Sequence, residues 1–334
     1  MKDVMQAIVL SNGVLSVQRV QRPQVAARDH LIIEMMVSAI NNGDKFFLTR
    51  ATPPGMPKSL YDIRGVSGVG RVLAIGDTVP EIYKGKTVAI YRSLYYSEQK
   101  VGTWSEYAHV PYLDCVILPD DVRPEDYSGS VVNAITPFAF LKQIIAEGHR
   151  GIISTAGSSA TGKAMLGFCL AHNFPLLSIV RSEKSRQELE ALGAKDVVVQ
   201  SSDDFNHELS EKAATLSTTA VFDGVGGQIL NNIIDSLPYG SVIYSYGYIG
   251  DTVPLTVTMS ALALKNLTIK PFMNTSSDTV KQPGQLKEAL KEIGALIHQP
   301  HFKTKLGTRF SMQQINEAVS YRGANGEKPV LLLR

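Results

Sequence analysis

Apolar residues divide the chain into two parts with different periodicity. Up to about residue 125 they form short, partly alternating runs separated by Gly, Pro and Asp, a pattern that predicts β-strands. These predicted strands cover residues 7–10, 31–40, 68–75, 87–91, 104–110 and 115–118. Two segments between them, 41–64 and 92–103, are longer than ordinary connections, and we expect them to be irregular and to contact a substrate.

The middle of the chain alternates between short apolar runs and segments with helical periodicity. A helix is predicted over 137–145, and strands are predicted at 151–155, 176–180, 197–199, 220–223, 241–246 and 267–272. Between the strands, apolar residues recur every three or four positions, as in Phe205, Leu209 and Ala213. Alternating strands and amphipathic helices predict an α/β fold with a doubly wound parallel sheet.

The C-terminal region combines helices with one strand. Four apolar residues at helical spacing predict an amphipathic helix: Leu286, Leu290, Ile293 and Ile297. Ser311 and Gln314 form a capping box, and residues 329–333 form a strand that we expect to pair with the N-terminal strands. The predicted domains are a β-rich domain of residues 1–125 and 275–334 and a cofactor domain of residues 126–274.

A turn of small residues joins the strand at 151–155 to a predicted helix over 162–172. Gly157, Ser159 and Gly162 match the dinucleotide fingerprint G-x-G-x-x-G, with serine at the middle position. In a βαβ unit such a turn presents backbone N–H groups and the positive end of a helix dipole to a pyrophosphate. We expect this turn to bind the pyrophosphate through Gly157, Ser158, Ser159, Ala160, Thr161 and Gly162.

Two alternatives for this turn stay open. A purely structural strand–helix connection would use the same small residues. A serine-hydrolase elbow also lies between a strand and a helix, but it needs G-x-S-x-G, and Thr161 stands at the position of its last glycine.

The end of the next strand indicates which dinucleotide would bind. In this fold an acidic residue there binds the ribose of NAD, whereas basic residues accommodate the 2′-phosphate of NADP. Arg181, Ser182 and Lys184 follow the strand, which favours NADP, although the same residues could be the solvated start of a helix. Gly247 follows a later strand and would let the backbone approach a nicotinamide.

Composition narrows the classes of function. The chain has 334 residues, which is long enough for two domains. Its net charge is only +2, so it lacks the strong positive field that would attract nucleic acid or an acidic membrane. No signal peptide or membrane-spanning run is recognised, which predicts a cytoplasmic protein. Cys115 and Cys169 lie far apart in apolar runs and are expected to be buried free thiols.

A metal centre is not expected. Zinc needs three or four Cys, His or carboxylate ligands at suitable spacing, and the chain offers two isolated cysteines and seven scattered histidines. His109 lies in a predicted strand, and His298 and His301 lie near a helix end. We expect these histidines at the surface.

Several further segments are informative together. They are residues 39–44 (Ala-Ile-Asn-Asn-Gly-Asp), 102–108 (Gly-Thr-Trp-Ser-Glu-Tyr-Ala), 132–136 (Val-Asn-Ala-Ile-Thr), 192–194, 223–227 and 326–328. In their order and content they resemble the medium-chain dehydrogenase/reductase superfamily, in its zinc-free quinone oxidoreductase and 2-enoyl thioester reductase branch. The resemblance covers nearly the whole chain and implies a GroES-like β-rich substrate domain and a Rossmann cofactor domain.

The resemblance also assigns roles to single residues. Zinc-dependent members have a Cys and a His at the positions of Asn41 and Val66, so it implies a protein without catalytic zinc. Asn41 would lie near the nicotinamide and the substrate. Asn133 and Thr136 would contact the cofactor or the substrate carbonyl, and Lys328 would contact the cofactor.

The thioester reductases of this branch carry a tyrosine, proposed as a proton donor, at the position of Thr52. Tyr61, Tyr91 or Tyr95 could supply a hydroxyl instead, or could serve only for packing. A quinone acceptor does not need such a group, because water can protonate its oxyanion.

The expected function is that of an NADPH-dependent, zinc-independent oxidoreductase that transfers a hydride to a quinone or an α,β-unsaturated carbonyl. A 2-enoyl thioester reductase and a non-catalytic NADPH-binding protein are the alternatives. The superfamily implies a homodimer in which the strand at 267–272 pairs with its twin, and Leu262 and Leu264 would add apolar area to that contact.

Overall fold

A computed structural model describes residues 3–49, 59–250, 252–323 and 326–334. The chain folds as two compact units, one of Met1–Ile135 with Val280–Arg334 and one of Thr136–Thr279. Helix α2 (Ser130–Ala146) continues from the first unit into the second. The fold is α/β, with a GroES-like first unit and a Rossmann second unit, as the sequence predicted.

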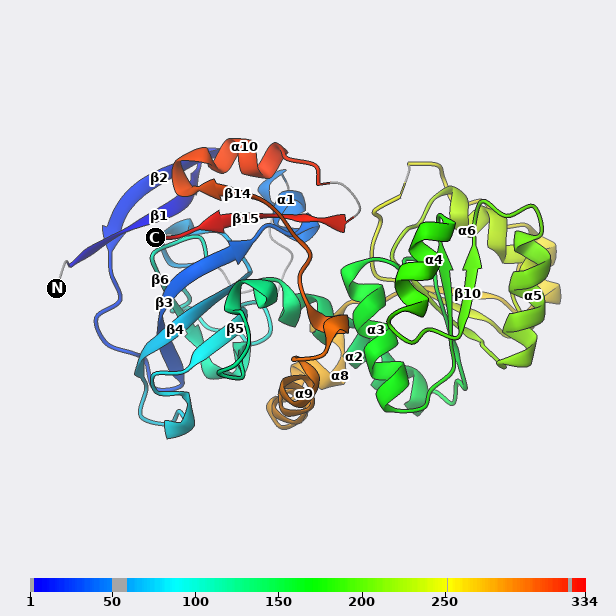
Figure 1. The fold of residues 1–334 in the computed structure, drawn as a ribbon, viewed down its shortest axis with the longest axis horizontal. Helices are drawn as coiled ribbons and strands as arrows, with labels where there is room; N and C mark the ends of the chain where they lie inside the picture. Colours follow the sequence, from blue (N-terminus) through cyan, green and yellow to red (C-terminus); the bar gives the residue numbers. More distant parts are fainter. Residues whose placement is uncertain (1–2, 50–58, 251, 324–325) are drawn as a thin grey trace. The chain divides into compact units, whose positions relative to one another are not determined.

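The first unit is built around a mixed seven-stranded sheet. Its strand order is β14-β15-β3-β4-β5-β7, and β6 also pairs with β3. The strands are β3 (His30–Ala39), β4 (Ser67–Ile75), β5 (Thr87–Tyr91), β6 (Tyr107–Pro111), β7 (Cys115–Ile117), β14 (Leu306–Ser311) and β15 (Lys328–Leu332). The C-terminal β15 runs antiparallel to β3, with Val330 opposite Ala39, which confirms the predicted return to the N-terminal strands (Figure 1).

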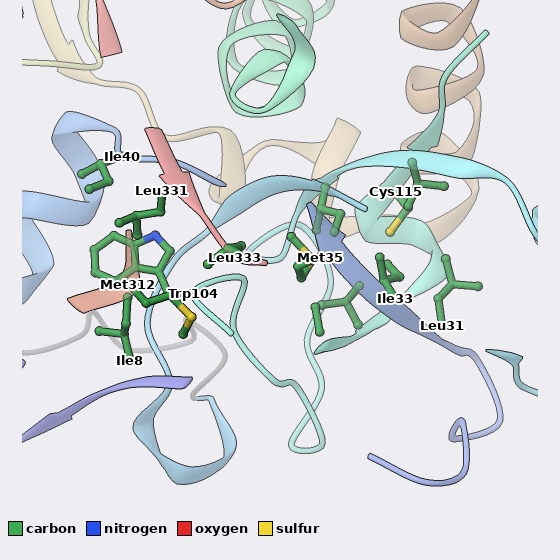
Figure 2. Close-up of a cluster of buried hydrophobic side chains, with 14 of the residues drawn as sticks. Ile8, Leu31, Ile33, Met35, Ile40, Trp104, Cys115, Met312, Leu331 and Leu333 are labelled. Atoms are coloured by element: carbon green, nitrogen blue, oxygen red, sulfur yellow. The ribbon is translucent and has the colours of Figure 1, made fainter. Parts of the chain in front are cut away.

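The core of this unit packs between the sheet and its flanking segments. Figure 2 shows Trp104 among aliphatic side chains from both ends of the chain, including Ile8 and Leu331. Trp104 is fully buried. The remaining elements are the hairpin β1 (Val4–Ser11) and β2 (Val14–Gln21), and helices α1 (Asn42–Thr49), α9 (Pro283–Leu296) and α10 (Ile315–Ser320).

The second unit holds a parallel six-stranded sheet with the order β10-β9-β8-β11-β12-β13. Its strands are β8 (Ile152–Ser154), β9 (Leu176–Val180), β10 (Asp196–Val199), β11 (Ala220–Asp223), β12 (Val242–Ser245) and β13 (Thr268–Pro271). The helices are α3 (Ala160–Ala171), α4 (Glu183–Glu190), α5 (Phe205–Thr215), α6 (Gln228–Ile233) and α7 (Met259–Leu264), followed by α8 (Asp278–Lys281) at the boundary of the units. The chain order reverses between β8 and β11, and in doubly wound sheets ligands bind at such a switch point.

Three expectations about local structure were wrong. Residues 41–64 are not wholly irregular, because α1 begins directly after β3. Helix α2 begins at Ser130, ahead of the predicted start, and contains Pro137 in its interior. His109 is buried in β6 rather than exposed, because both of its ring nitrogens have backbone partners.

Other local predictions are confirmed. Both cysteines are buried free thiols. The apolar faces of α5 and α9 are buried, and the Ser311–Gln314 capping box is present. Within the described residues, one helical stretch, Pro124–Ala146, has the length and composition to cross a membrane; 61% of its apolar window is buried inside the protein, as in a core helix.

Candidate functional site

The turn between β8 and α3 in the second unit needs its two glycines for close packing. A Cβ on Gly162 would lie 2.2 Å from the carbonyl oxygen of Ala156, and one on Gly157 would lie 3.0 Å from Ser178 Cβ on β9. The backbone therefore turns tightly against β9 and enters α3 at once. This is the geometry that the fingerprint glycines provide in dinucleotide-binding βαβ units.

Ser159, at the position of the missing middle glycine, is the N-cap of α3. Its side-chain oxygen accepts a hydrogen bond of 3.0 Å from the backbone N–H of Gly162. The preceding N–H groups, of Ala160 and Thr161, are in the first turn of the helix and have no intrahelical acceptor. Together with the helix dipole they fit a phosphate group, so the residues present are compatible with a dinucleotide.

Asp223, at the end of β11, shapes the neighbouring glycine loop. Its Oδ1 atom accepts hydrogen bonds from the Thr155 hydroxyl (2.7 Å) and from the N–H groups of Val225 and Gly226 (3.1 Å each). Gly226 and Gly227 have positive φ, which explains glycine at these two positions. The loop after β11 is thus held in one conformation beside the β8 turn.

Gly247 lies after β12 and is packed against the same loop. A Cβ on Gly247 would lie 2.9 Å from the carbonyl oxygen of Gly224. Tyr246, just before it, stacks on Phe222 with ring centroids 3.9 Å apart. Burial and the nearby Asp223 raise the pKa of the Tyr246 phenol above its ordinary value. The sequence analysis did not identify Tyr246, although it is adjacent to Gly247.

The basic residues after β9 are at the surface. Arg181 and Lys184 are exposed, and Ser182 caps α4 by accepting a hydrogen bond of 3.4 Å from Ser185 N–H. Glu183 lies in the first turn of α4 and is 3.7 Å from Arg186, so it is paired within its own helix. Two cationic side chains at the end of β9, the strand next to β8, are therefore available to bind a phosphate. Thr136, also in this unit, accepts a hydrogen bond of 2.8 Å from Asn274.

A second polar group of residues lies in the first unit, at the junction of β3 and α1. Asn41 is buried, and its side-chain N–H₂ donates to Ser67 Oγ (2.8 Å) and Asp44 Oδ2 (3.1 Å). Asp44 also accepts the backbone N–H groups of Asn41 (2.8 Å) and Val66 (3.1 Å). Asn41 precedes α1 and Asp44 is its third residue, so the carboxylate caps the helix and fixes the Asn41 side chain.

Lys328, the first residue of β15, joins this network from the far end of the sequence. Its ammonium donates to Asn41 Oδ1 and, at 3.2 Å, to Asn133 Oδ1 on α2. Asn133 in turn donates to the carbonyl oxygen of Gly129 at 2.7 Å. We call Asn41, Asp44, Ser67, Asn133 and Lys328 the amide–lysine cluster. The structure thus brings together three residues that the sequence analysis selected separately.

Burial changes the acid–base properties of this cluster. It raises the pKa of Asp44 above its ordinary value, although the hydrogen bonds from Asn41 and the charge of Arg92 act in the opposite direction. It lowers the pKa of Lys328 to about 8, against the attraction of Asp44. Lys328 is therefore an ammonium that can release a proton near neutral pH.

Buried charges flank the cluster on the segment 92–103. The Arg92 side chain is buried and donates to the carbonyl oxygen of Gly65, and burial lowers its pKa to about 10. Lys100 is fully buried with its Nζ 2.5 Å from Asp114 Oδ2 and also donates to the Arg92 carbonyl oxygen. These contacts hold in place a segment that the sequence analysis expected to be irregular and to contact a substrate.

The predicted tyrosines differ in their placement. Tyr61 is 46% exposed, has a φ of +59° and lies outside the amide–lysine cluster. Tyr91 is buried at the end of β5, directly opposite Ser67 in the strand ladder. Thr52 lies outside the described residues.

No group of three or more potential metal ligands occurs in the part of the chain that the structure describes. At the two positions where the resemblance would place zinc ligands, Asn41 offers a neutral amide and Val66 only a backbone N–H and an alkyl group. The Asn41 oxygen already accepts the Lys328 ammonium. This donor set does not fit a zinc ion, which binds Cys, His and carboxylate side chains.

Asp44, Ser67, Asp223 and Tyr246 were not among the predicted site residues. Asp44 had a signal in the sequence, because it stands three residues after Asn41 at a capping position. The participation of Ser67 and Asp223 in the site depends on strand register and loop geometry, which cannot be read from the sequence pattern.

Comparisons with known proteins agree with this architecture. Residues 160–293 match the family described as zinc-binding dehydrogenase. The chain is 23% identical over 285 residues to an enoyl-[acyl-carrier-protein] reductase, mitochondrial, from Arabidopsis thaliana, covering 83% of this chain and 72% of that protein. It is 22% identical to a quinone oxidoreductase from Salmonella typhimurium, covering 67% of this chain and 66% of that protein.

A solved structure extends the match to the whole chain. The structure of a putative NADPH:quinone reductase from Mesorhizobium loti superimposes with a TM-score of 0.74 at 22% identity, covering 99% of both chains. At this identity the likeness establishes the fold. Together with the sequence matches, it makes the chain similar in sequence and in fold to quinone oxidoreductases and enoyl reductases of the medium-chain dehydrogenase/reductase superfamily.

Proposed function

We propose that this chain is an oxidoreductase that uses NADPH, without a catalytic metal, to reduce a quinone or an α,β-unsaturated carbonyl. The observation that carries the proposal is the amide–lysine cluster. It places the amide oxygens of Asn41 and Asn133 around the Lys328 ammonium, and Asn41 stands at a position where the resemblance would place a zinc ligand. A site without a metal Lewis acid is suited to acceptors whose conjugation already delocalises the charge that a hydride delivers.

The second unit supports a dinucleotide as the hydride source. The β8 turn offers two helix N-terminal N–H groups and the required close packing of Gly157 and Gly162. Arg181 and Lys184 would bind the 2′-phosphate and thereby favour NADPH over NADH. The nicotinamide supplies the hydride when bound, and the residues of the chain orient the reactants and handle the proton.

Direct binding and turnover measurements test this function. NADPH and NADH are titrated by fluorescence, and a panel of quinones, enones and crotonyl-type thioesters is assayed with NADPH. We expect NADPH to bind at least roughly tenfold more tightly than NADH, which is about 1.4 kcal/mol. Equal binding of the two cofactors would contradict the NADPH assignment.

The enoyl thioester reductase is the second candidate, and the curated relatives named enoyl-[acyl-carrier-protein] reductase favour it. Turnover of crotonyl-type thioesters well above that of quinones would support it. A non-catalytic NADPH-binding protein is the third candidate. Tight NADPH binding without reduction of any acceptor on the panel would favour that outcome.

A further inference from the structure

The orientations of two asparagines fix the surroundings of the Lys328 ammonium. Asn41 gives its amide N–H₂ group to Ser67 and Asp44, and Asn133 gives its own to the carbonyl oxygen of Gly129. Both amide oxygens must then face the other way, and both accept from Lys328 Nζ. Flipping either amide would place N–H groups against the ammonium, so the hydrogen-bond network defines the geometry.

Two amide oxygens hold the ammonium without neutralising it. An ammonium has three N–H donors, and among the described residues the two asparagines receive two of them. The charged group that acts on Lys328 is Asp44, whose carboxylate is itself engaged by Asn41, Val66 and the charge of Arg92. The third N–H is therefore available to an oxygen acceptor.

Among the residues that the structure describes, the cluster contains no second acid with the same access. Asp44 is buried under Asn41 and accepts hydrogen bonds rather than facing outward. Tyr61 lies outside the cluster and is 46% exposed, and Tyr91 is buried opposite Ser67 on the neighbouring strand. Lys328 is only partly buried, and its pKa of about 8 allows it to be protonated at neutral pH and still give up the proton.

We propose that Lys328 is the proton donor of the reaction, acting on the oxygen of the conjugated acceptor. This inference rests on the proposed function. A bound reduced nicotinamide would supply the hydride, which would leave an electron pair on the acceptor oxygen. The Lys328 N–H bond then breaks and an O–H bond forms, which gives an enol or hydroquinone and a neutral amine. A proton from water restores the ammonium, and Asn41 and Asn133 act as positioning residues.

The first test measures the ammonium without cofactor or substrate. The free protein is labelled with trace acetic anhydride from about pH 6 to about pH 11, and the modification of Lys328 is quantified by mass spectrometry. We expect its midpoint near 8, below the ordinary lysine value of 10.5. In Asn41→Asp the added carboxylate favours the ammonium, so the midpoint should rise. A wild-type midpoint at or above the ordinary value would overturn the proposal.

The second test separates proton donation from charge and from cofactor binding. In Lys328→Met we expect kcat to fall by roughly 100-fold or more, the scale of a lost general acid. Lys328→Arg should stay similarly slow, because a guanidinium keeps the charge but does not release its proton. The NADPH Kd should change by no more than about threefold in both variants. The wild-type kcat should fall as the pH rises through about 8, since the donor must be protonated.

A control and the opposing outcomes complete the design. Lys86→Met removes a partly exposed lysine of the same unit, which is ion-paired with Asp120, and should leave kcat unchanged. Recovery of wild-type kcat in Lys328→Arg would overturn proton donation in favour of a purely electrostatic role. Weaker NADPH binding with normal kcat in Lys328→Met would also overturn it. If the wild-type protein reduces no acceptor at all, the proposed function fails, whereas normal turnover in a folded Lys328→Met overturns only the role of the lysine.

Discussion

Arg181 is the residue whose replacement reports most directly on cofactor choice. It is exposed at the end of β9, so removal of its side chain should leave the fold intact. We predict that Arg181→Ala weakens NADPH binding by about 1 to 3 kcal/mol, the scale of a charge-assisted hydrogen bond to phosphate, and barely affects NADH. Fluorescence titration of both cofactors measures this. Arg150→Ala, another exposed arginine of the same unit, is the matched control, and equal losses for NADPH and NADH would contradict the prediction.

Ser159 shows how a departure from a motif acquires a structural role. The serine replaces a fingerprint glycine and caps α3 through Gly162 N–H. We predict that Ser159→Ala destabilises α3 by about 1 kcal/mol, whereas Ser159→Gly costs only a few tenths, because glycine is a tolerated N-cap and alanine is not. Hydrogen exchange of the α3 amides compares the two variants with the wild type. Faster exchange in the glycine variant than in the alanine variant would argue against the capping role.

Among the elements, β6 makes the stability of the first unit sensitive to acid. His109 accepts the Ala27 N–H at Nε2 (3.0 Å), pairs with the Gln99 carbonyl through Nδ1 (3.0 Å) and lies 4.6 Å from the His30 ring. Burial, together with the neighbouring His30, lowers the pKa of His109 to about 4. Below pH 6.5 the unfolded chain therefore binds more protons than the folded chain, and the free energy of unfolding falls as the pH falls from about 6.5 toward 4.

This acid effect can be followed selectively, because Trp104 is the only tryptophan and lies in the core of the same unit. Urea unfolding monitored by Trp104 fluorescence should show a loss of up to about 3 kcal/mol over that pH range, and His30, whose pKa burial also lowers, adds in the same direction. His109→Gln should flatten the pH dependence. The exposed His207→Gln is the control, and an unchanged slope in His109→Gln would contradict this account.

The elements that the sequence predicted correctly are those that bury either nearly all of their residues or one regular face. Strand β3 is almost entirely buried and reads as a long apolar run, whereas α5 and α9 bury one face each, so their apolar residues recur at helical spacing. Strands β2 and β14 were not predicted, because most of their side chains are at least partly exposed and leave no apolar alternation. Helix α1 is short and depends on Asn41 and Asp44 for its N-terminus, a signal of capping rather than of periodicity.

At the scale of the whole molecule, the sequence located the two site regions but not their internal connections. The β8 turn was predictable because its residues are consecutive. The amide–lysine cluster joins Asn41, Asn133 and Lys328 from three distant parts of the chain, through the pairing of β15 with β3 and the position of α2. The sequence predicted that the C-terminal strand returns to the N-terminal strands, but it did not specify β3 as the partner, the register of the pair or the position of α2. The contact between Lys328 and the two amides, on which the proposed chemistry depends, therefore required the structure.

The prediction of a homodimer rests on the outer edge of the second unit's sheet. Strand β13 is the last strand of the sheet, so one of its edges has no partner strand among the described residues, and an unpaired edge is a template for another chain. Apolar side chains are exposed on β13 and on α7 before it: Met259 (75%), Leu262 (37%), Leu264 (77%) and Ile269 (37%). A two-fold axis at this edge would pair β13 with its copy and bury these side chains on both protomers.

We predict that the wild-type protein is a dimer in light scattering at micromolar concentration. The double variant Leu264→Glu, Ile269→Lys should be a monomer. The control Ile82→Lys, at an exposed position in the other unit, should stay dimeric. A wild-type monomer, or a double variant that remains dimeric, would show that this edge is not the interface.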